Sequence, residues 1–305
     1  MLVDSNLCWK LSVREVLRPL SVYVSIAIIA ALVNRFNHPF RYVAVPDLPI
    51  TVLGAILGIL LAFRINSSYG RWWEARTLWG GLINQSRSLS RQALAFICDA
   101  PSAQTSEAGR FGCTIVHLQI ALVHALRCGL RGQAPWDDIS PFVTPDLLAK
   151  LKNESSVVTC LLREMGDLAV SAANARIFSE WRLHRIDSTL SEISNIQGGC
   201  ERIKNTPLPR QFDFYPDLFV NIYCLLVPIC LVNELGLFTP LVTLLADFVM
   251  LVLNRLGADL ENPFDNTVYD ISMLSLSRTI EINLRQTLGE QNLPPAIQPV
   301  DGVLW

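Results

Sequence analysis

The sequence predicts an all-α, multi-pass membrane protein with four transmembrane helices and a helical cytosolic domain. Of its 305 residues 51% are hydrophobic and 17% are charged, whereas about a quarter of a soluble domain is charged. Uncharged runs that approach the thickness of a bilayer recur along the chain. Basic residues gather between these runs: residues 64–210 hold 17 of the 25 Lys and Arg and 13 of the 27 acidic residues, a local charge of +4. This distribution is typical of a cytosolic region between membrane spans.

The N-terminal residues 1–18 predict an interfacial segment, because apolar and charged residues mix in SNLCWKLSVREVL. Acidic residues stand among the basic ones and no small-residue cleavage site follows, so we expect a retained anchor and no secretory signal. The first transmembrane helix is predicted over residues 19–34, sixteen uncharged positions between Arg18 and Arg35.

The second transmembrane helix is predicted over residues 48–63, another sixteen uncharged positions, and the two spans make residues 19–63 the first membrane region. Sixteen helical residues extend about 24 Å, close to the roughly 30 Å of a hydrocarbon core. Residues 64–92 contain no proline, so the helix is expected to continue to Gln92. The loop between the two spans is expected outside the cell.

Two stripes run along this second span. One is small (Gly54, Gly58, Ala62) and its neighbour is progressively bulkier (Ala55, Ile59, Phe63). Small residues at this spacing let transmembrane backbones approach closely. A helix packed on the small stripe would present Ile59 and Phe63 to a shared axis, and a packed span with no pore is the alternative.

Residues 64–213 are predicted to form the cytosolic helical region. Helices are expected from about Arg110 to Leu130, from near Asp146, and from about Ala169 to Gln197, the last capped by Gly198 and Gly199.

The second membrane region is predicted over residues 214–254. Its third helix covers residues 218–233, with a kink at Pro228. A fourth apolar run follows the loop ELGLFTP and ends at Leu253. Asp247 interrupts it and is a candidate intramembrane polar site, since an ionisable group in hydrocarbon is costly and faces protein or water. A tilted span that leaves Asp247 beside a water-filled crevice is the alternative.

The C-terminal residues 255–305 predict a cytosolic helix to about Gly289 and an irregular, Pro-rich tail. Four spans place both termini in the cytosol, and we expect the protein in the cell (inner) membrane.

Two clusters contain residue types that ligate metals, but neither is predicted to bind a metal ion. Four residues share one helical face but span roughly 22 Å of its axis, too far for a single zinc ion: Cys113, His117, His124 and Cys128. Four acidic residues lack the spacing of an EF-hand and predict a turn: Asp259, Glu261, Asp265 and Asp270.

Enzyme signatures are missing from the sequence. It has no GxSxG, P-loop, HExxH or GxGxxG motif, and its histidines have no carboxylate partner nearby in the chain. The eight cysteines show no CxxC spacing and predict reduced, mostly buried thiols. We therefore expect neither an enzyme nor a cofactor, and no nucleic-acid partner.

Three motifs resemble the bestrophin family of ion channels, in its bacterial branch: FRINSSYGRWWEARTLWG (63–80), GGCERIKNTPLP (198–209) and LGADLENPFDNTVYDISM (256–273). With the four spans they cover about residues 10–290. The resemblance implies a homopentamer with one axial pore, whose hydrophobic neck maps to Ala55, Ile59 and Phe63. It also implies a cytosolic constriction at Trp181. A single gap in the alignment to the family would move this position to Ile177, Leu183 or Ile186.

The expected function is a channel for small monovalent ions, chloride favoured, with inorganic ions, the lipid bilayer and further copies of the chain as its partners. A sodium channel of the same family and a non-conducting membrane scaffold are the alternatives. The chain lacks the dense acidic run of the animal members after its last span, so calcium activation is not expected.

Overall fold

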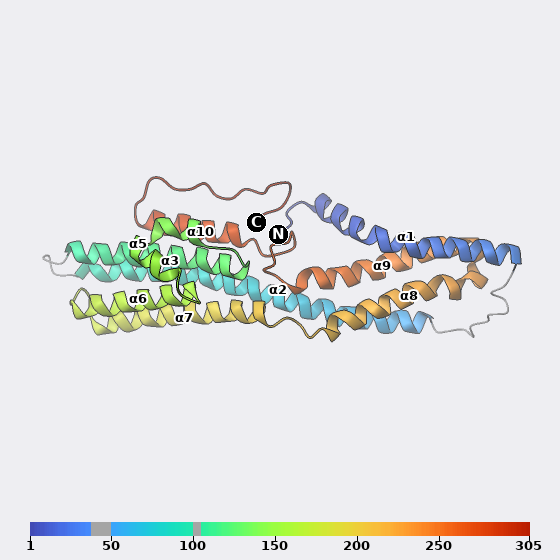
Figure 1. Cartoon of the computed structure of the whole chain (residues 1–305), viewed down its shortest axis with the longest axis horizontal. Helices are drawn as coiled ribbons and strands as arrows, with labels where there is room; N and C mark the ends of the chain where they lie inside the picture. The colour runs from blue at the N-terminus through green and yellow to red at the C-terminus, as the bar shows by residue number, and fades with distance from the viewer. Residues whose placement is uncertain (38–49, 100–104) are drawn as a thin grey trace. The chain divides into compact units, whose positions relative to one another are not determined.

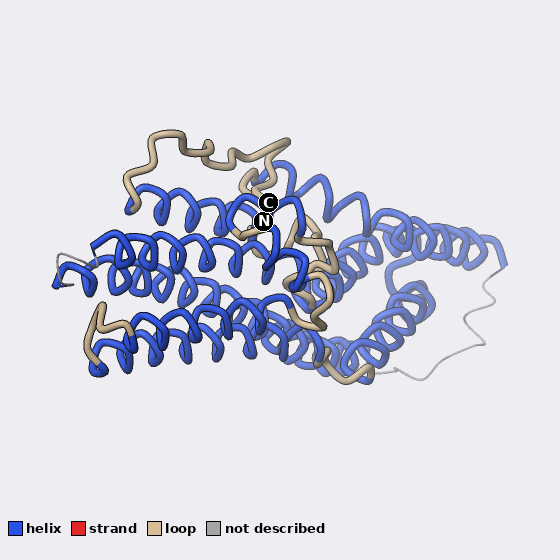
Figure 2. The backbone as a smooth tube through the Cα atoms, turned by 60° about the vertical axis from the view of Figure 1, so that its left-hand side comes forward, coloured by secondary structure: helices blue, strands red, loops and turns tan. Residues whose placement is uncertain are grey.

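The structure is a computed structural model that describes residues 1–37, 50–99 and 105–305. Most of the predicted outer loop lies outside this part of the chain, as do the side chains of residues 5–12, Cys8 among them, and of Cys98. The described residues form helices and loops but no β-strand (Figure 2). Val300 and Val303 form an isolated β-bridge. The predicted all-α fold is therefore confirmed.

The chain divides into two compact units, which share helix α2 (Ile50–Ala95). One unit, the transmembrane bundle, comprises residues 2–72 and 207–263. The other unit, the helical domain, comprises Met1 and residues 73–206 and 264–305.

The transmembrane bundle contains α1 (Ser5–Asn37), the first part of α2, α8 (Gln211–Leu235) and α9 (Thr239–Glu261). Helix α1 lies along α9, and α8 packs against both (Figure 1). All four helices contribute to one apolar core: Val16, Leu20, Leu61, Val220, Cys224 and Leu251. The predicted first and third spans lie inside α1 and α8. Helix α2 continues past Arg64, as predicted, and ends at Ala95, three residues after the predicted end at Gln92.

The helical domain contains the rest of α2 and six further α-helices. They are α3 (Thr105–Leu130), α4 (Trp136–Ile139), α5 (Pro145–Leu151), α6 (Val157–Asn174), α7 (Glu180–Asn205) and α10 (Met273–Thr287). Short 3-10 turns follow α2, α4 and α8: Phe96–Asp99, Ser140–Phe142 and Gly236–Phe238. Helix α3 packs against α6 and α10, and α6 against α7 (Figure 1).

Among residues 1–37, 50–99 and 105–305, four segments are long and apolar enough to cross a membrane, but one of them is α3. Its apolar window is 78% buried inside the protein, whereas the windows in α1, in α2 and in the α8–α9 segment are 17–28% buried. Helix α3 therefore directs its apolar side chains at protein. The four predicted spans correspond to α1, the start of α2, α8 and α9.

The predicted helix from Ala169 to Gln197 was wrong at both ends. Helix α6 stops at Asn174 and α7 begins after Ser179. Arg176, in the turn between them, has a φ of 58°, which ends the helix. Gly198 and Gly199 lie inside α7. At Gly199 an added Cβ would stand 2.9 Å from Leu78 Cδ1, so this glycine allows close packing on α2 and does not cap a helix.

The predicted C-terminal helix from Arg255 to Gly289 was also wrong. Helix α9 ends at Glu261, residues 262–272 form turns, and α10 begins at Met273. Pro263 cannot continue the backbone hydrogen bonding of α9. Asn266 has a φ of 66°, a conformation that asparagine tolerates well.

Candidate functional site

The predicted neck stripe lies on a face of α2 that its own chain leaves uncovered. Ile59 is 61% and Phe63 65% exposed, and Ala55 is exposed as well. The opposite face carries Leu57 and Leu61, both buried. One side of this helix is therefore packed, and the other is free for a pore, a neighbouring chain or lipid.

The small stripe beside the neck residues packs only at its first position. An added Cβ at Gly54 would stand 3.0 Å from the Tyr223 hydroxyl, which brings α2 close to α8. Gly58 has no neighbour within 4 Å of that position, and Ala62 is exposed. Within one chain, the small stripe as a whole therefore does not pack against another helix, and it does not orient the neck residues.

Arg64 fixes the orientation of α2 directly after Phe63. Its side chain is 3% exposed, pairs with Asp213 of α8 and donates from Nη1 to Asn254 Oδ1 of α9 at 2.5 Å. Gly257 of α9 leaves room for it, since a Cβ there would stand 3.2 Å from Arg64 Cδ. In the sequence, Arg64 marks only the end of an apolar run. Its partners lie more than 140 residues away in the chain, and no local pattern reveals them.

Asp247 faces protein inside the transmembrane bundle. It is fully buried in α9, and Tyr23 of α1 and Cys224 of α8 are polar neighbours. Thr243 and Thr239 continue the same buried stripe one and two turns earlier, respectively. A position beside protein is one of the two environments expected for an intramembrane carboxyl group.

Trp181 lies in the first turn of α7 and is 68% exposed. Two of the alternative positions for the constriction, Ile177 and Ile186, are buried in the core of the helical domain. Leu183 is partly covered. Trp181 is thus the most exposed of the four side chains.

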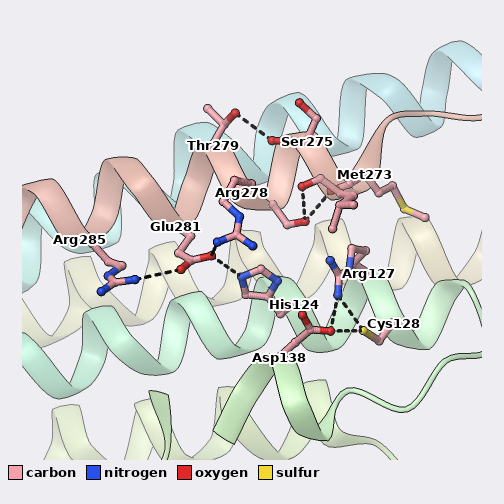
Figure 3. A network of polar contacts seen from close by, with 12 residues as sticks. His124, Arg127, Cys128, Asp138, Met273, Ser275, Arg278, Thr279, Glu281 and Arg285 are labelled. Carbon is pink, nitrogen blue, oxygen red and sulfur yellow. Dashed lines mark hydrogen bonds and ion pairs between the residues drawn. The ribbon is translucent and has the colours of Figure 1, made fainter. Parts of the chain in front are cut away.

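The His and Cys residues of α3 do not form a metal site. His117 Nε2 lies 3.0 Å from Glu290 Oε1, and His124 Nε2 lies 3.1 Å from Glu281 Oε2 (Figure 3 shows the second pair). No three potential metal ligands converge anywhere in the described part of the chain. The carboxylate partners, which the sequence analysis missed, come from α10 and the segment after it.

Glu281 is the centre of a polar network beside α3 (Figure 3). Arg278 and Arg285 pair with it at 3.3 and 3.2 Å, and His124 approaches from the other side. Burial alone would raise the pKa of Glu281. The hydrogen bond from His124 and the charge of Arg278 outweigh burial, so the pKa is lowered and the carboxylate stays ionised. A cavity of about 390 Å³ lies beside this network.

The acidic residues near the end of α9 have separate partners. Asp259 pairs with Arg255 at 2.9 Å in the transmembrane bundle. In the helical domain, Asp265 accepts from Lys204 at 2.6 Å, and Asp270 accepts from the Asn266 backbone N–H at 2.6 Å. Asp265 and Asp270 lie in a turn, as the sequence predicts, whereas Asp259 and Glu261 belong to helix α9 and correct that prediction.

The six cysteines whose side chains are described are free thiols. Cys128, Cys160, Cys200 and Cys224 are buried, Cys230 is partly covered and Cys113 is exposed. Burial raises the pKa of Cys200 to about 12, which keeps it protonated and unreactive.

Comparison with known sequences identifies relatives along nearly the whole chain. A voltage-dependent anion channel-forming protein of Ralstonia nicotianae is 32% identical over 94% of this chain and 92% of its own. The voltage-dependent anion channel-forming protein YneE of Escherichia coli is 33% identical over 82% of this chain and 80% of its own.

A solved structure also matches nearly the whole chain. The crystal structure of a bacterial bestrophin homologue from Klebsiella pneumoniae, in a variant form, matches with a TM-score of 0.83 and 27% identity. The match covers 90% of this chain and all of that one. A family model described as bacterial/fungal bestrophin protein matches residues 6–286. The chain therefore belongs to the bacterial/fungal bestrophin family of membrane proteins.

Proposed function

We propose that this bestrophin is an anion channel, chloride favoured, made by five copies of the chain around one axial pore. The relatives in Ralstonia and E. coli are named as anion channel-forming proteins, which supports a channel and not an enzyme. The observation that carries the pore is the uncovered stripe of α2, because Ile59 and Phe63 project from a helix that is packed on its opposite side. Arg64 anchors that helix next to the stripe.

The pore neck consists of rings of Ala55, Ile59 and Phe63 from each copy. Such rings are narrow and poorly wetted, so an ion sheds part of its hydration shell or waits for the neck to widen. The edges of phenyl rings carry partial positive charge, which favours an anion passing Phe63. Trp181, exposed at the start of α7, forms a second constriction on the cytosolic side.

The charge of the chain also favours anions. Residues 64–210 carry +4 per chain, and five copies place about +20 around a shared axis, which raises the local concentration of anions. In this arrangement the protein lies in the cell (inner) membrane with both termini in the cytosol.

Ion flux through reconstituted liposomes tests the neck. We expect Ile59→Ala and Phe63→Ala each to raise chloride flux several-fold, because a smaller ring widens and wets the neck. Ile29→Ala is the matched control: Ile29 on α1 is also 61% exposed, and its truncation should leave flux unchanged. Unchanged flux in both neck variants would remove these residues from the pore.

Reversal potentials under a salt gradient separate this function from its alternatives. An anion channel gives a reversal potential with the sign of the chloride equilibrium potential. A sodium channel gives a reversal potential of the opposite sign. A scaffold gives no current from the purified protein at any pH or salt concentration.

A further inference from the structure

A polar cavity of about 770 Å³ lies among the four helices of the transmembrane bundle. Three positive and three negative side chains line it: Glu15, Arg64, Arg210, Asp213, Asp217 and Arg255. They come from α1, from α2, from α8 with the residue before it, and from α9 (Figure 1). A cavity of this size accommodates a small polar ligand.

The lining residues sit where the four apolar runs end. Arg64 follows the second span, Asp217 precedes the third, and Asn254 follows the fourth. Glu15 stands just before the first span. In a bilayer these positions lie at the depth of the lipid headgroups, because charged side chains flank the hydrocarbon core.

Internal pairing leaves one positive and one negative side chain without an ionic partner. Arg64 pairs with Asp213, and Arg255 pairs with Glu15 at 2.7 Å. Arg210 makes no ion pair with any described residue.

Asp217 accepts hydrogen bonds only from neutral amides within the described chain. The Asn254 Nδ2 donates to Asp217 Oδ1 at 3.0 Å, and the Asn221 Nδ2 lies 3.3 Å from Asp217 Oδ2.

We propose that this cavity binds the headgroup of phosphatidylethanolamine. The phosphate accepts from Arg210, and the ammonium group donates to Asp217. A primary ammonium offers three N–H donors. Phosphatidylcholine has none, and phosphatidylglycerol has a phosphate but no cation, so neither satisfies both ends of the site.

Lipid titrations of the delipidated protein in mild detergent test this assignment, with binding followed by native mass spectrometry. The probes are short-chain phosphatidylethanolamine, phosphatidylcholine and phosphatidylglycerol, together with soluble phosphoethanolamine. We expect phosphatidylethanolamine to bind about tenfold more tightly than the other two lipids, since only it places a phosphate against Arg210 and a cation with N–H donors against Asp217. Soluble phosphoethanolamine should bind far more weakly than its lipid.

Two variants separate the two ends of the headgroup. Asp217→Asn should weaken phosphatidylethanolamine about tenfold and leave phosphatidylglycerol unchanged, whereas Arg210→Gln should weaken both by a similar factor. Both positions are exposed, so the fold is expected to persist, and a thermal melt verifies it. Arg18→Gln, an exposed charge at the same depth but outside the cavity, is the control.

Two results would overturn the proposal. Equal binding of the three lipids with no effect of Asp217→Asn would show that the cavity does not select an ammonium group. Equal binding of soluble phosphoethanolamine would assign the site to a soluble metabolite and not to lipid. Chloride flux measured on the same variants is an independent readout of the pore.

Discussion

Glu281 contacts three basic side chains of the helical domain: His124, Arg278 and Arg285. Its pKa is lowered, so in the ionised form it stabilises the fold above its unfolded pKa of about 4.3. That stabilisation is lost as the pH falls through the folded pKa.

We predict that Glu281→Gln lowers the free energy of unfolding by about 3 kcal/mol at pH 7, because it leaves two arginines and His124 around a neutral group. The measurement is urea unfolding in detergent from pH 3 to 7. The free energy of unfolding of the variant should fall less steeply with decreasing pH than that of the wild type. Glu290→Gln is the control, with a loss of about 1 kcal/mol, since Glu290 is 29% exposed. Equal losses in the two variants would contradict the assigned role of Glu281.

The residues that carry the proposed pore could be predicted from the sequence, but their supports could not. Ile59 and Phe63 follow from a stripe inside one helix, which a 3.6-residue period reveals. Arg64, Asp213 and Asn254 meet only after folding, and so do His124 and Glu281. Ion pairs between distant segments leave no local pattern in the chain.

At the level of the helices, two adjacent glycines of α7 have opposite roles. Gly199 packs against Leu78, where an added Cβ would come within 2.9 Å of a methyl carbon. Gly198 has open space around the same position.

We predict that Gly199→Ala destabilises the protein by about 1–3 kcal/mol through overpacking. Gly198→Ala should instead stabilise it by about 0.5–1 kcal/mol, because alanine is the better residue inside a helix. Thermal melts of the two variants in detergent test this difference. Adding Leu78→Ala should restore part of the stability lost in Gly199→Ala. If the stability losses of the two single variants simply add in the double variant, there is no clash between Leu78 and Ala at position 199.

The sequence predicts most of the long helices correctly, but it predicts where they begin and end poorly. The spans and α3 follow from long apolar stretches that propensity and periodicity mark clearly. The break between α6 and α7 lies in ARIFS, which contains neither glycine nor proline; its one signal is Ser179, a favoured N-cap residue followed by the acidic Glu180. The glycine pair predicts a cap wrongly because glycine serves both at caps and at close helix contacts.

For the whole molecule, the central prediction is its assembly. The uncovered stripe of α2 needs further copies to become a pore, and a chain of 34.0 kDa assembled five times gives about 170 kDa. Light scattering coupled to size exclusion, corrected for detergent, measures this mass directly. A monomeric mass that persists in lipid nanodiscs would exclude an axial pore.

The burial of α3 has a consequence for biosynthesis. As the chain leaves the ribosome, the translocon meets a 24-residue segment with a mean hydropathy of 1.4 that resembles a membrane span. Lateral insertion of this segment would invert the topology of everything that follows. Correct biogenesis therefore requires the nascent α3 to be withheld from the lipid until α6 and α10, its later-synthesised partners, have been translated.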